Sequence, residues 1–569
     1  MKKRTAWVLA AGVAAVAIGA AAVGALALVL RGRGTPALGG SNYLVLNLAG
    51  GIPEEPPSEL APFFERRPPS LRTLVESIDR AATDARVKAV VLRVSVLPDT
   101  GWGKVQELRD AIGRFRKSGK PAYAHLEFSG NKEYYLATAC DKVYVVPTAL
   151  LDVTGLAAEV TFFRGTLDKL GVQAQFEGVG KYKNAPNQLT ERGFTEPHRE
   201  QMDELLDSLY AQYLGAIAAA RGKTPEQTQA AIDGGPYDGP AALEAGLVDE
   251  LVYEDQLQER LHDADQVTPS RYVKASRGFG FDGRPKLALV YLVGEILPGE
   301  SQDSPFGGSF AGSDTVSEAL RSAREDGDVK AVILRVDSPG GSGTASDVIW
   351  REVELTKKKK PVVVSMGDVA ASGGYYVSMG SDAIVAQPGT ITGSIGVFGG
   401  KLSMRGFYEK LGLSKEVLKR GRHADLFDEY RPWTDEERAH IHEMMASFYT
   451  RFVTKAAEGR KRSYEEIDAV AQGRVWTGAA ALEQGLVDRL GGLDVALALA
   501  KERAKIPGHQ EVQLVVLPER KGLFETFLER QEEGLEAALP RDVRALLRWA
   551  MLLRDGQPLT RLPFELRIR

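Results

Sequence analysis

A serine between a predicted strand and a predicted helix is the strongest candidate nucleophile in the chain. Ser372 follows Ala370 and Ala371 and precedes Gly373 and Gly374. Small neighbours let a substrate carbonyl approach the hydroxyl, and backbone N–H groups at a helix start can hold an oxyanion. The same string also fits an ordinary turn with a serine cap. Acyl transfer at Ser372 is therefore a hypothesis that needs a second residue.

That second residue is a base, and a lysine is the best candidate. The chain has seven histidines, none in an evident Ser-His-Asp arrangement. A lysine can act as a base if burial lowers its pKa from about 10.4 toward 7–8. Lys183 has no carboxylate within five residues, and Lys181 adds like-charge repulsion. The alternatives are that Lys183 is a solvated surface lysine, or that His423 is the base.

The chain also repeats itself over a long distance. Residues 87–94 return almost unchanged as residues 329–336, and residues 239–249 return as residues 478–488. Both pairs have nearly the same spacing, which indicates an internal duplication. The period is much longer than that of a solenoid repeat, so each copy is expected to be a whole domain.

The two copies have lost complementary halves of one possible site. When the Tyr-Tyr pairs at 134–135 and 375–376 are aligned, Asn131 lies opposite Ser372. The same alignment places Ala424 opposite Lys183. This pattern suggests an ancestral domain that held both the serine and the lysine, which were later divided between the copies.

Strands rich in Val, Ile and Leu are predicted to position these residues. They lie at 43–48 and 87–94, at 287–292 and 329–336 in the second copy, and at 361–366. Helical segments alternate with them, which is typical of an α/β domain with a buried, mostly parallel sheet. The predicted fold class is therefore α/β, with two tandem domains from the duplication.

The domain boundary is placed where periodicity is lost. Residues 266–286 show no clear pattern and carry Pro269 and several glycines. We therefore expect an N-terminal repeat over 42–275, which would supply the lysine, and a C-terminal repeat over 284–517, which would supply the serine. Residues 518–569 are expected to form a charged C-terminal tail.

The N-terminus has the pattern of a membrane anchor. Residues 1–5 are basic, and the run from Ala6 to Leu30 carries no charge. About 20 apolar residues span a bilayer as a helix, so 6–30 is predicted to be an uncleaved transmembrane signal anchor. A cleaved secretion signal is the alternative. Residues 1–5 would be cytoplasmic, 31–41 would be a tether, and the remainder would lie outside the cytoplasm.

Composition limits the other classes. The net charge of −4 gives no support for nucleic-acid binding. Cys140 is the single cysteine, which excludes an intramolecular disulfide and a cysteine-rich metal site.

Three spaced strings resemble a known family. Residues 338–342, 370–376 and 392–397 resemble, in order, signal peptide peptidase A in its long form with tandem domains. Residues 179–185 are similar to the general-base motif of that family. The resemblance implies a ClpP/crotonase-like fold and a bacterial, membrane-anchored Ser/Lys protease that needs no metal or cofactor.

The resemblance also implies a role for each residue. Ser372 would be the nucleophile that forms an acyl-enzyme, and Lys183, from the other repeat, would be the base. Ser394 would hydrogen-bond the lysine amine. The implied oxyanion donors are the backbone amides of Gly373 and of the turn glycines Gly340 and Gly341.

The implied substrates are cleaved signal peptides and other hydrophobic peptides. The family resemblance further implies a homo-oligomer, expected to be a tetramer, in the bacterial inner membrane with its catalytic domains on the extracytoplasmic side. Two rival hypotheses are a crotonase-like acyl-CoA enzyme and a non-catalytic, membrane-tethered peptide-binding scaffold.

Overall fold

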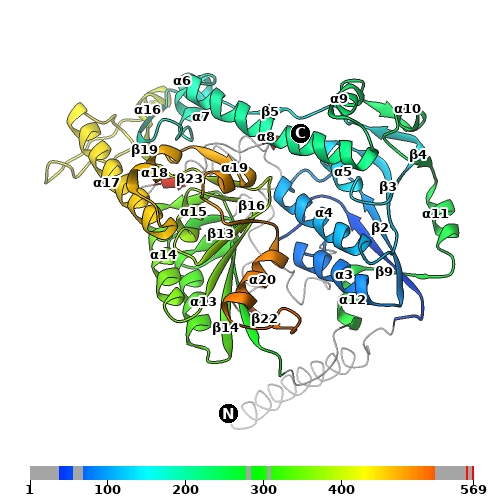
Figure 1. Ribbon diagram of the computed structural model, residues 1–569. Coiled ribbons are helices and arrows are strands. Elements are labelled where there is room, and N and C mark those ends of the chain that lie inside the picture. The colour runs from blue at the N-terminus through cyan, green and yellow to red at the C-terminus, as the bar shows by residue number, and fades with distance from the viewer. Residues whose placement is uncertain are drawn as a thin grey trace, which may run out of the picture.

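The computed structural model describes residues 38–55, 68–276, 283–303, 309–518, 559–561 and 567–568. Two sheets, one from each repeat, lie side by side with helices packed against them (Figure 1). Most neighbouring strands in both sheets run parallel. The predicted α/β class is confirmed.

The sheet of the N-terminal repeat has the strand order β7-β4-β3-β2-β1-β9, and β8 pairs with β4. Its strands are β1 (Asn42–Leu48), β2 (Val87–Val94), β3 (Ala122–Ser129), β4 (Lys142–Leu151), β7 (Tyr237–Asp238), β8 (Glu250–Leu251) and β9 (Asp265–Val267). The helices of this repeat are α3 (Leu71–Thr83), α4 (Trp102–Arg116), α5 (Asn131–Ala137), α6 (Arg164–Leu170), α7 (Asn187–Thr190), α8 (Glu196–Arg221), α9 (Pro225–Asp233), α10 (Gly239–Glu244), α11 (Glu254–Arg260) and α12 (Pro269–Ser276).

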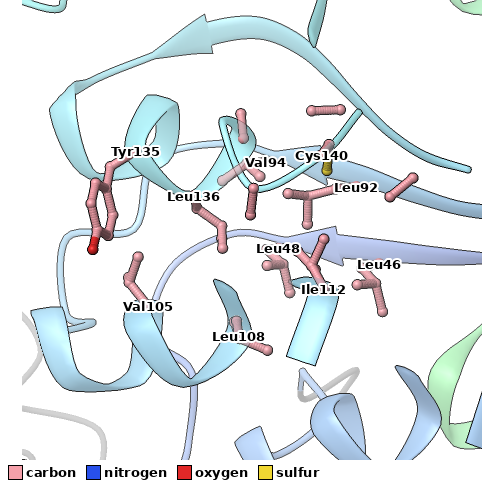
Figure 2. Packing of buried hydrophobic residues seen from close by; sticks show 14 of the residues in the cluster. Leu46, Leu48, Leu92, Val94, Val105, Leu108, Ile112, Tyr135, Leu136 and Cys140 are labelled. Carbon is pink, nitrogen blue, oxygen red and sulfur yellow. The ribbon is translucent and has the colours of Figure 1, made fainter. Parts of the chain in front are cut away.

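The core of this repeat lies between the sheet and helices α4 and α5. Figure 2 shows Leu108 and Ile112 of α4 and Leu136 of α5 next to Leu46 of β1 and Leu92 of β2. All five side chains are buried. Burying aliphatic side chains of this size contributes about 1.5–3 kcal/mol each. The helix faces and the strands therefore hold each other in place.

The C-terminal repeat has the same architecture in the order β20-β18-β16-β14-β10-β22, with β17 paired to β16 and β21 paired to β17. Its strands are β10 (Lys286–Val293), β14 (Val329–Ser338), β16 (Val362–Ala371), β17 (Ala383–Ala386), β18 (Ile391–Gly393), β20 (Val475–Thr477), β21 (Arg489–Leu490) and β22 (Gln513–Leu517). Its helices are α13 (Ser313–Glu325), α14 (Gly343–Lys357), α15 (Gly373–Ser378), α16 (Arg405–Lys410), α17 (Asp435–Arg460), α18 (Tyr464–Val470), α19 (Gly478–Glu483) and α20 (Leu493–Arg503).

The duplication extends to irregular details. The β1–β2 pairing slips in register at Asn42/Tyr43, and the β10–β14 pairing slips at Lys286/Leu287. The long helices α8 and α17 both have 26 residues and both follow a threonine N-cap. Shared irregularities of this kind follow from a common ancestral domain.

A third sheet contains strands of both repeats. Its order is β12-β13-β11-β15-β23-β19-β6. The strands are β12 (Gln302–Asp303), β13 (Ser309–Gly312), β11 (Glu295–Leu297), β15 (Gly340–Ser342), β23 (Leu559–Arg561), β19 (Val397–Ser403) and β6 (Gln173–Val179). Strand β6, from the N-terminal repeat, pairs antiparallel with β19 over its whole length, from Val397↔Val179 to Ser403↔Gln173. This pairing brings the residues after Val179 into the C-terminal repeat. A separate small sheet pairs β5 (Ala158–Glu159) with β24 (Arg567–Ile568).

Buried charges join α4 to β14 and β16. Lys104 Nζ lies 2.8 Å from an oxygen of Asp337 and 3.4 Å from one of Asp368. The Asp368 carboxylate also accepts the backbone N–H groups of Gly101 and Lys104 at the start of α4. Burial alone would lower the pKa of Lys104, but the carboxylates of Asp337, Asp368 and Glu54 raise it. The ammonium group is therefore charged and ties the two repeats together.

Residues 266–286, read as lacking periodicity, contain β9 and α12, and α12 buries Tyr272, whose hydroxyl donates to Asp84. The predicted anchor at 6–30 lies outside the described residues. Within the part of the chain that the structure describes, no helix has the length and apolar character needed to cross a membrane.

Candidate active site

Ser372 lies where β16 ends and α15 begins. Its backbone has φ 55° and ψ −110°, a conformation that a residue with a side chain adopts only at an energetic cost. The Ser372 N–H donates to the Gly393 carbonyl at 2.8 Å, and its carbonyl accepts from Tyr376 N at the same distance. Strand β18 and helix α15 thus hold the strained residue on both sides.

Lys183 lies in the loop between β6 and α7. The loop is attached to the C-terminal repeat, because the Tyr182 N–H donates to the Gln472 carbonyl at 2.8 Å. A second bond, from Lys183 N to the Gly180 carbonyl, closes a turn immediately before the lysine. With β6 paired to β19, these bonds direct the Lys183 side chain into the other repeat.

The two side chains meet within one chain. Lys183 Nζ lies 2.7 Å from Ser372 Oγ, and both residues are buried. Burial lowers the pKa of Lys183 well below the ordinary value of 10.5. A lower pKa increases the neutral fraction of the amine, and only a neutral amine can accept a proton.

Ser394 is the third residue at this point, and it is fully buried. Lys183 Nζ donates to Ser394 Oγ at 2.9 Å and to the Ser394 carbonyl at 3.0 Å. A neutral amine has two N–H bonds and one lone pair. Because Ser394 supplies two acceptors, the lone pair of the amine is left to face the Ser372 hydroxyl.

The predicted oxyanion glycines lie beside the serine. Gly373 is the first residue of α15, so its amide has no acceptor within its own helix. A Cβ added to Gly340, which has φ +96°, would lie 2.6 Å from the Gly373 nitrogen. The Gly340 N–H donates to Ser338 Oγ at 3.1 Å. Gly341 follows Gly340 in β15. Gly340 must be a glycine here, because a side chain would block the Gly373 amide.

Three further glycines hold the lysine loop: Gly180 and Gly396 lie in strings that resemble family motifs, and Gly473 was missed by sequence reasoning. Gly473 has φ +77°, and a Cβ there would lie 2.5 Å from the Lys183 nitrogen. A Cβ on Gly396 would lie 3.1 Å from Lys183 Cδ, and one on Gly180 would lie 2.6 Å from the Gln472 backbone. Only the motif at 392–397 gave a signal for Gly396, and no pattern marked Gly473.

The aligned positions in the opposite repeats hold no such pair. Asn131 uses its side chain structurally: it donates to the Gly155 carbonyl and accepts from Thr154 N, Gly155 N and the Tyr213 hydroxyl. His423, the alternative base, is exposed and stacks on His440 with ring centroids 5.8 Å apart. The side chain bonded to Ser372 is that of Lys183.

A cavity of about 470 Å³ adjoins the lysine. Its lining comes mainly from β6, the lysine loop and α7, and includes Gly178, Lys183, Pro186 and Phe398. Cavities of 300–1,000 Å³ are of the size that holds small ligands or side chains. The residue Lys183 therefore borders a cavity large enough to hold a side chain of a substrate.

Comparisons with known proteins agree with this arrangement. The sequence profile of Peptidase family S49 matches residues 114–268 and 354–507, one segment in each repeat. The chloroplastic serine protease SPPA of Arabidopsis thaliana is 39% identical over 460 residues, which cover 79% of this chain and 68% of that protein. Protease 4 of Salmonella typhi is 32% identical over 498 residues, which cover 84% of this chain and 78% of the relative.

Solved structures match at lower similarity. A 1510-N membrane-bound stomatin-specific protease in complex with a substrate peptide has a TM-score of 0.27 at 16% identity and covers 44% of this chain and 100% of that one. ClpP1 from Listeria monocytogenes has a TM-score of 0.22 at 16% identity and covers 36% of this chain and 89% of that one. These scores are too low to support an argument, so the fold rests on the strand order described above.

The matches in sequence define the class: the chain is a serine protease. It belongs to Peptidase family S49, and its similarity to SPPA and Protease 4 extends over most of its length. Family membership removes the two rival hypotheses, an acyl-CoA enzyme and a scaffold without catalysis.

Proposed function

We propose that the chain is a membrane-anchored endopeptidase that uses a Ser372/Lys183 dyad to degrade cleaved signal peptides and other hydrophobic peptides. The contact of 2.7 Å between Lys183 Nζ and Ser372 Oγ is the observation that carries the proposal. It joins a strained serine at a helix start to an amine whose pKa is lowered by burial.

In the acylation step, Ser372 Oγ attacks the scissile carbonyl while its proton passes to the Lys183 amine. The carbonyl oxygen becomes an oxyanion, which the Gly373 amide is placed to bind together with an amide of the turn at Gly340 and Gly341. When the C–N bond breaks, the Lys183 ammonium group gives its proton to the departing amine. The products of this step are an ester at Ser372 and a peptide with a new N-terminus.

In the deacylation step, the neutral Lys183 takes a proton from a water molecule, which attacks the ester carbonyl. The ester bond breaks, Ser372 recovers its proton from Lys183, and the second peptide leaves with a carboxylate. Ser394 acts as a positioning residue in both steps, because it holds the amine N–H groups and leaves the lone pair toward the hydroxyl.

The dyad is tested by cleavage of a synthetic signal peptide with the full chain in detergent. Ser372→Ala and Lys183→Ala are each expected to lower kcat by at least about 1,000-fold, since removing a nucleophile or its base abolishes the acyl-enzyme route. Lys181→Ala is the matched control, because Lys181 lies two residues away with a side chain that is 58% exposed. Full activity in Lys183→Ala would refute the base assignment.

The membrane anchor rests on the uncharged run at 6–30 and the basic residues before it. Together they support an inner-membrane location with both repeats outside the cytoplasm. After expression of the full chain in a bacterium, we expect it in the membrane fraction after alkaline extraction. We also expect that a protease added to intact cells digests the repeats only after the outer membrane has been made permeable. Recovery in the soluble fraction would refute the anchor.

The proposal includes a homo-oligomer, for which an exposed apolar segment gives support. Leu418 is 96% exposed. Other apolar side chains exposed in the same part of the C-terminal repeat are Leu411, Leu413, Val417 and Phe427. Apolar side chains gathered on one surface segment are typical of an interface. Light scattering of the detergent-solubilised chain should give the mass of an oligomer, expected to be a tetramer, and Leu418→Asp should reduce it. A monomer mass for the unaltered chain would contradict this part.

A further inference from the structure

Strand β23, from the far C-terminus, lies in the middle of the third sheet and next to the candidate active site. It pairs antiparallel with β15 through Gly340↔Arg561, Gly341↔Thr560 and Ser342↔Leu559. On its other side, Leu559 pairs antiparallel with Phe398 of β19. In the strand order, β23 lies between β15 and β19, and Figure 1 shows the label of β23 next to that of β19. Without it, these two strands would border a slot with unpaired backbone groups on both sides.

This slot is flanked by the parts of the site. Strand β15 begins at Gly340, beside the Gly373 amide. Strand β19 follows Ser394 and holds β6, which leads to Lys183. An extended peptide that adds a strand to open sheet edges is held by main-chain hydrogen bonds, a recurring mode of peptide recognition. The slot is therefore shaped for an extended peptide whose backbone passes the dyad.

The Thr560 carbonyl lies close to Gly340 and Gly373, two of the candidate oxyanion residues. A Cβ placed on Gly340 would lie 2.0 Å from the Thr560 carbonyl oxygen and 2.6 Å from the Gly373 nitrogen. The oxygen and the amide therefore flank the same point. The Thr560 hydroxyl lies 2.9 Å from the position of a Cβ on Gly373 and donates to the Gly341 carbonyl. Thr560 is completely buried in this position.

The residues on either side of Thr560 are also held. Leu559 is buried in an apolar cluster with Phe398 of β19 and Leu189 of α7. Arg561 Nε lies 3.6 Å from an oxygen of Glu295 of β11. Backbone pairing, apolar burial and a charge pair thus act together on three consecutive residues.

We propose that residues 559–561 are an autoinhibitory strand that occupies the peptide-binding slot and must leave it before a substrate can bind. The inference rests on the proposed function, because the slot is defined by its position beside Ser372 and Lys183. Substrates that displace the strand would bind in its direction, antiparallel to β15 and β19, with an apolar side chain in the cluster that holds Leu559.

Binding can be tested without cleavage. The probe is a fluorescent peptide with the sequence of residues 556–565, added to the full chain carrying Ser372→Ala. Leu559→Asp in the protein places a charge in the apolar cluster and should free the slot. If the strand leaves the slot in about one chain in ten, freeing it should tighten probe binding about tenfold. The Leu559→Met chain, which keeps an apolar side chain, should bind the probe with the same affinity as the chain with the native tail.

Two results would overturn the inference. One is an equal affinity of the probe for the chain with the native tail and for the Leu559→Asp chain. The other is weaker binding of the probe to the Leu559→Asp chain, which would mean that the strand forms part of the wall of the slot. A thermal melt of each variant checks that the repeats remain folded. A probe with proline in place of Thr560 loses a backbone N–H and should bind more weakly than the unaltered probe.

A second readout separates this inference from the proposed function. With Ser372 present, Leu559→Asp should lower the KM for a signal peptide about tenfold and leave kcat unchanged, as expected when a competitor is removed. If no chain cleaves peptide while probe affinity still rises in Leu559→Asp, the proposed function fails, and occupation of a peptide-binding slot by the strand is still supported. If cleavage occurs with the same KM in both chains, the strand is refuted and the dyad stands.

Discussion

Gly473 offers a sharp test of how the lysine is held, because it touches no reacting atom. In Gly473→Ala, the new Cβ would lie 2.5 Å from the Lys183 nitrogen and 2.6 Å from its Cα and Cβ. These are backbone atoms and the root of the side chain, so they cannot move away as a flexible side-chain tip can. The lysine loop must therefore shift as a unit.

The size of the effect follows from this geometry. Ordinary contact with a Cβ begins at 3.4 Å, so the loop must move by roughly 1 Å. A displacement of about 1 Å in a catalytic group can lower the rate about 100-fold. The backbone at Gly473 has φ +77°, so the alanine also costs about 1–2 kcal/mol of stability in this left-handed conformation.

Gly222→Ala is the matched control. Gly222 has φ +61° at the end of α8, and an added Cβ would meet no atom within 4 Å. Both variants should therefore lose the stability that the left-handed backbone costs an alanine, and Gly473→Ala should lose more because its loop must also shift. Only Gly473→Ala should lose about 100-fold in kcat for a signal peptide. A Gly473→Ala enzyme within about threefold of the unaltered kcat would refute the reasoning that the glycine positions Lys183.

Four further predictions follow from buried contacts of the chain. Because burial lowers the pKa of Lys183 and the neutral amine is the base, kcat/KM should rise with pH and level off well below 10.5; a rise only near 10.5 would contradict this. Below pH 10.5, Lys183 binds a proton in the unfolded chain that it releases on folding. The free energy of unfolding therefore falls as the pH falls toward the pKa of Lys183 in the folded chain. The melting temperature of Lys183→Met should therefore exceed that of the unaltered chain near neutral pH. The difference between the two melting temperatures should shrink as the pH approaches 10.5. Ser394→Ala removes one hydrogen-bond acceptor of the Lys183 amine. It should lower kcat about tenfold with KM unchanged, because one hydrogen bond is worth about 0.5–1.5 kcal/mol. Ser394→Thr, which keeps a hydroxyl group, should retain more activity than Ser394→Ala. Lys104→Met leaves Asp337 and Asp368 without their buried counter-charge and should destabilise the chain by about 3–5 kcal/mol in denaturant, whereas Lys88→Met, at an exposed site, should change stability by less than about 0.5 kcal/mol.

The sequence was informative where local pattern and duplication were enough. Runs of Val, Ile and Leu marked β2 and β14, and their repetition predicted two copies of one α/β unit. Comparison of the copies singled out Ser372 and Lys183, which the structure places in contact. Family resemblance added Ser394, and its two acceptors for the amine are present.

Other features gave no signal in sequence, because they depend on contacts between distant segments. The buried charges between Lys104 and Asp368 resemble ordinary polar residues in their own segments. Gly473 is marked only by the backbone that packs against it. The tail was expected to be a charged extension, and nothing in its composition indicated that Leu559 would pair with Phe398.

The sequence by itself therefore determined the types of strand and helix, the duplication and the candidate reactive side chains. Hydrophobic pattern and chain order contain this information directly. Tertiary structure alone decided that β6 crosses to pair with β19, that Lys183 is buried with a lowered pKa, and that β23 lies between β15 and β19. The physical reason is that strands pair through backbone groups, which all residues share. The sequence of a strand therefore does not specify the strand with which it pairs. Desolvation depends in the same way on the whole surroundings and not on neighbours in the chain.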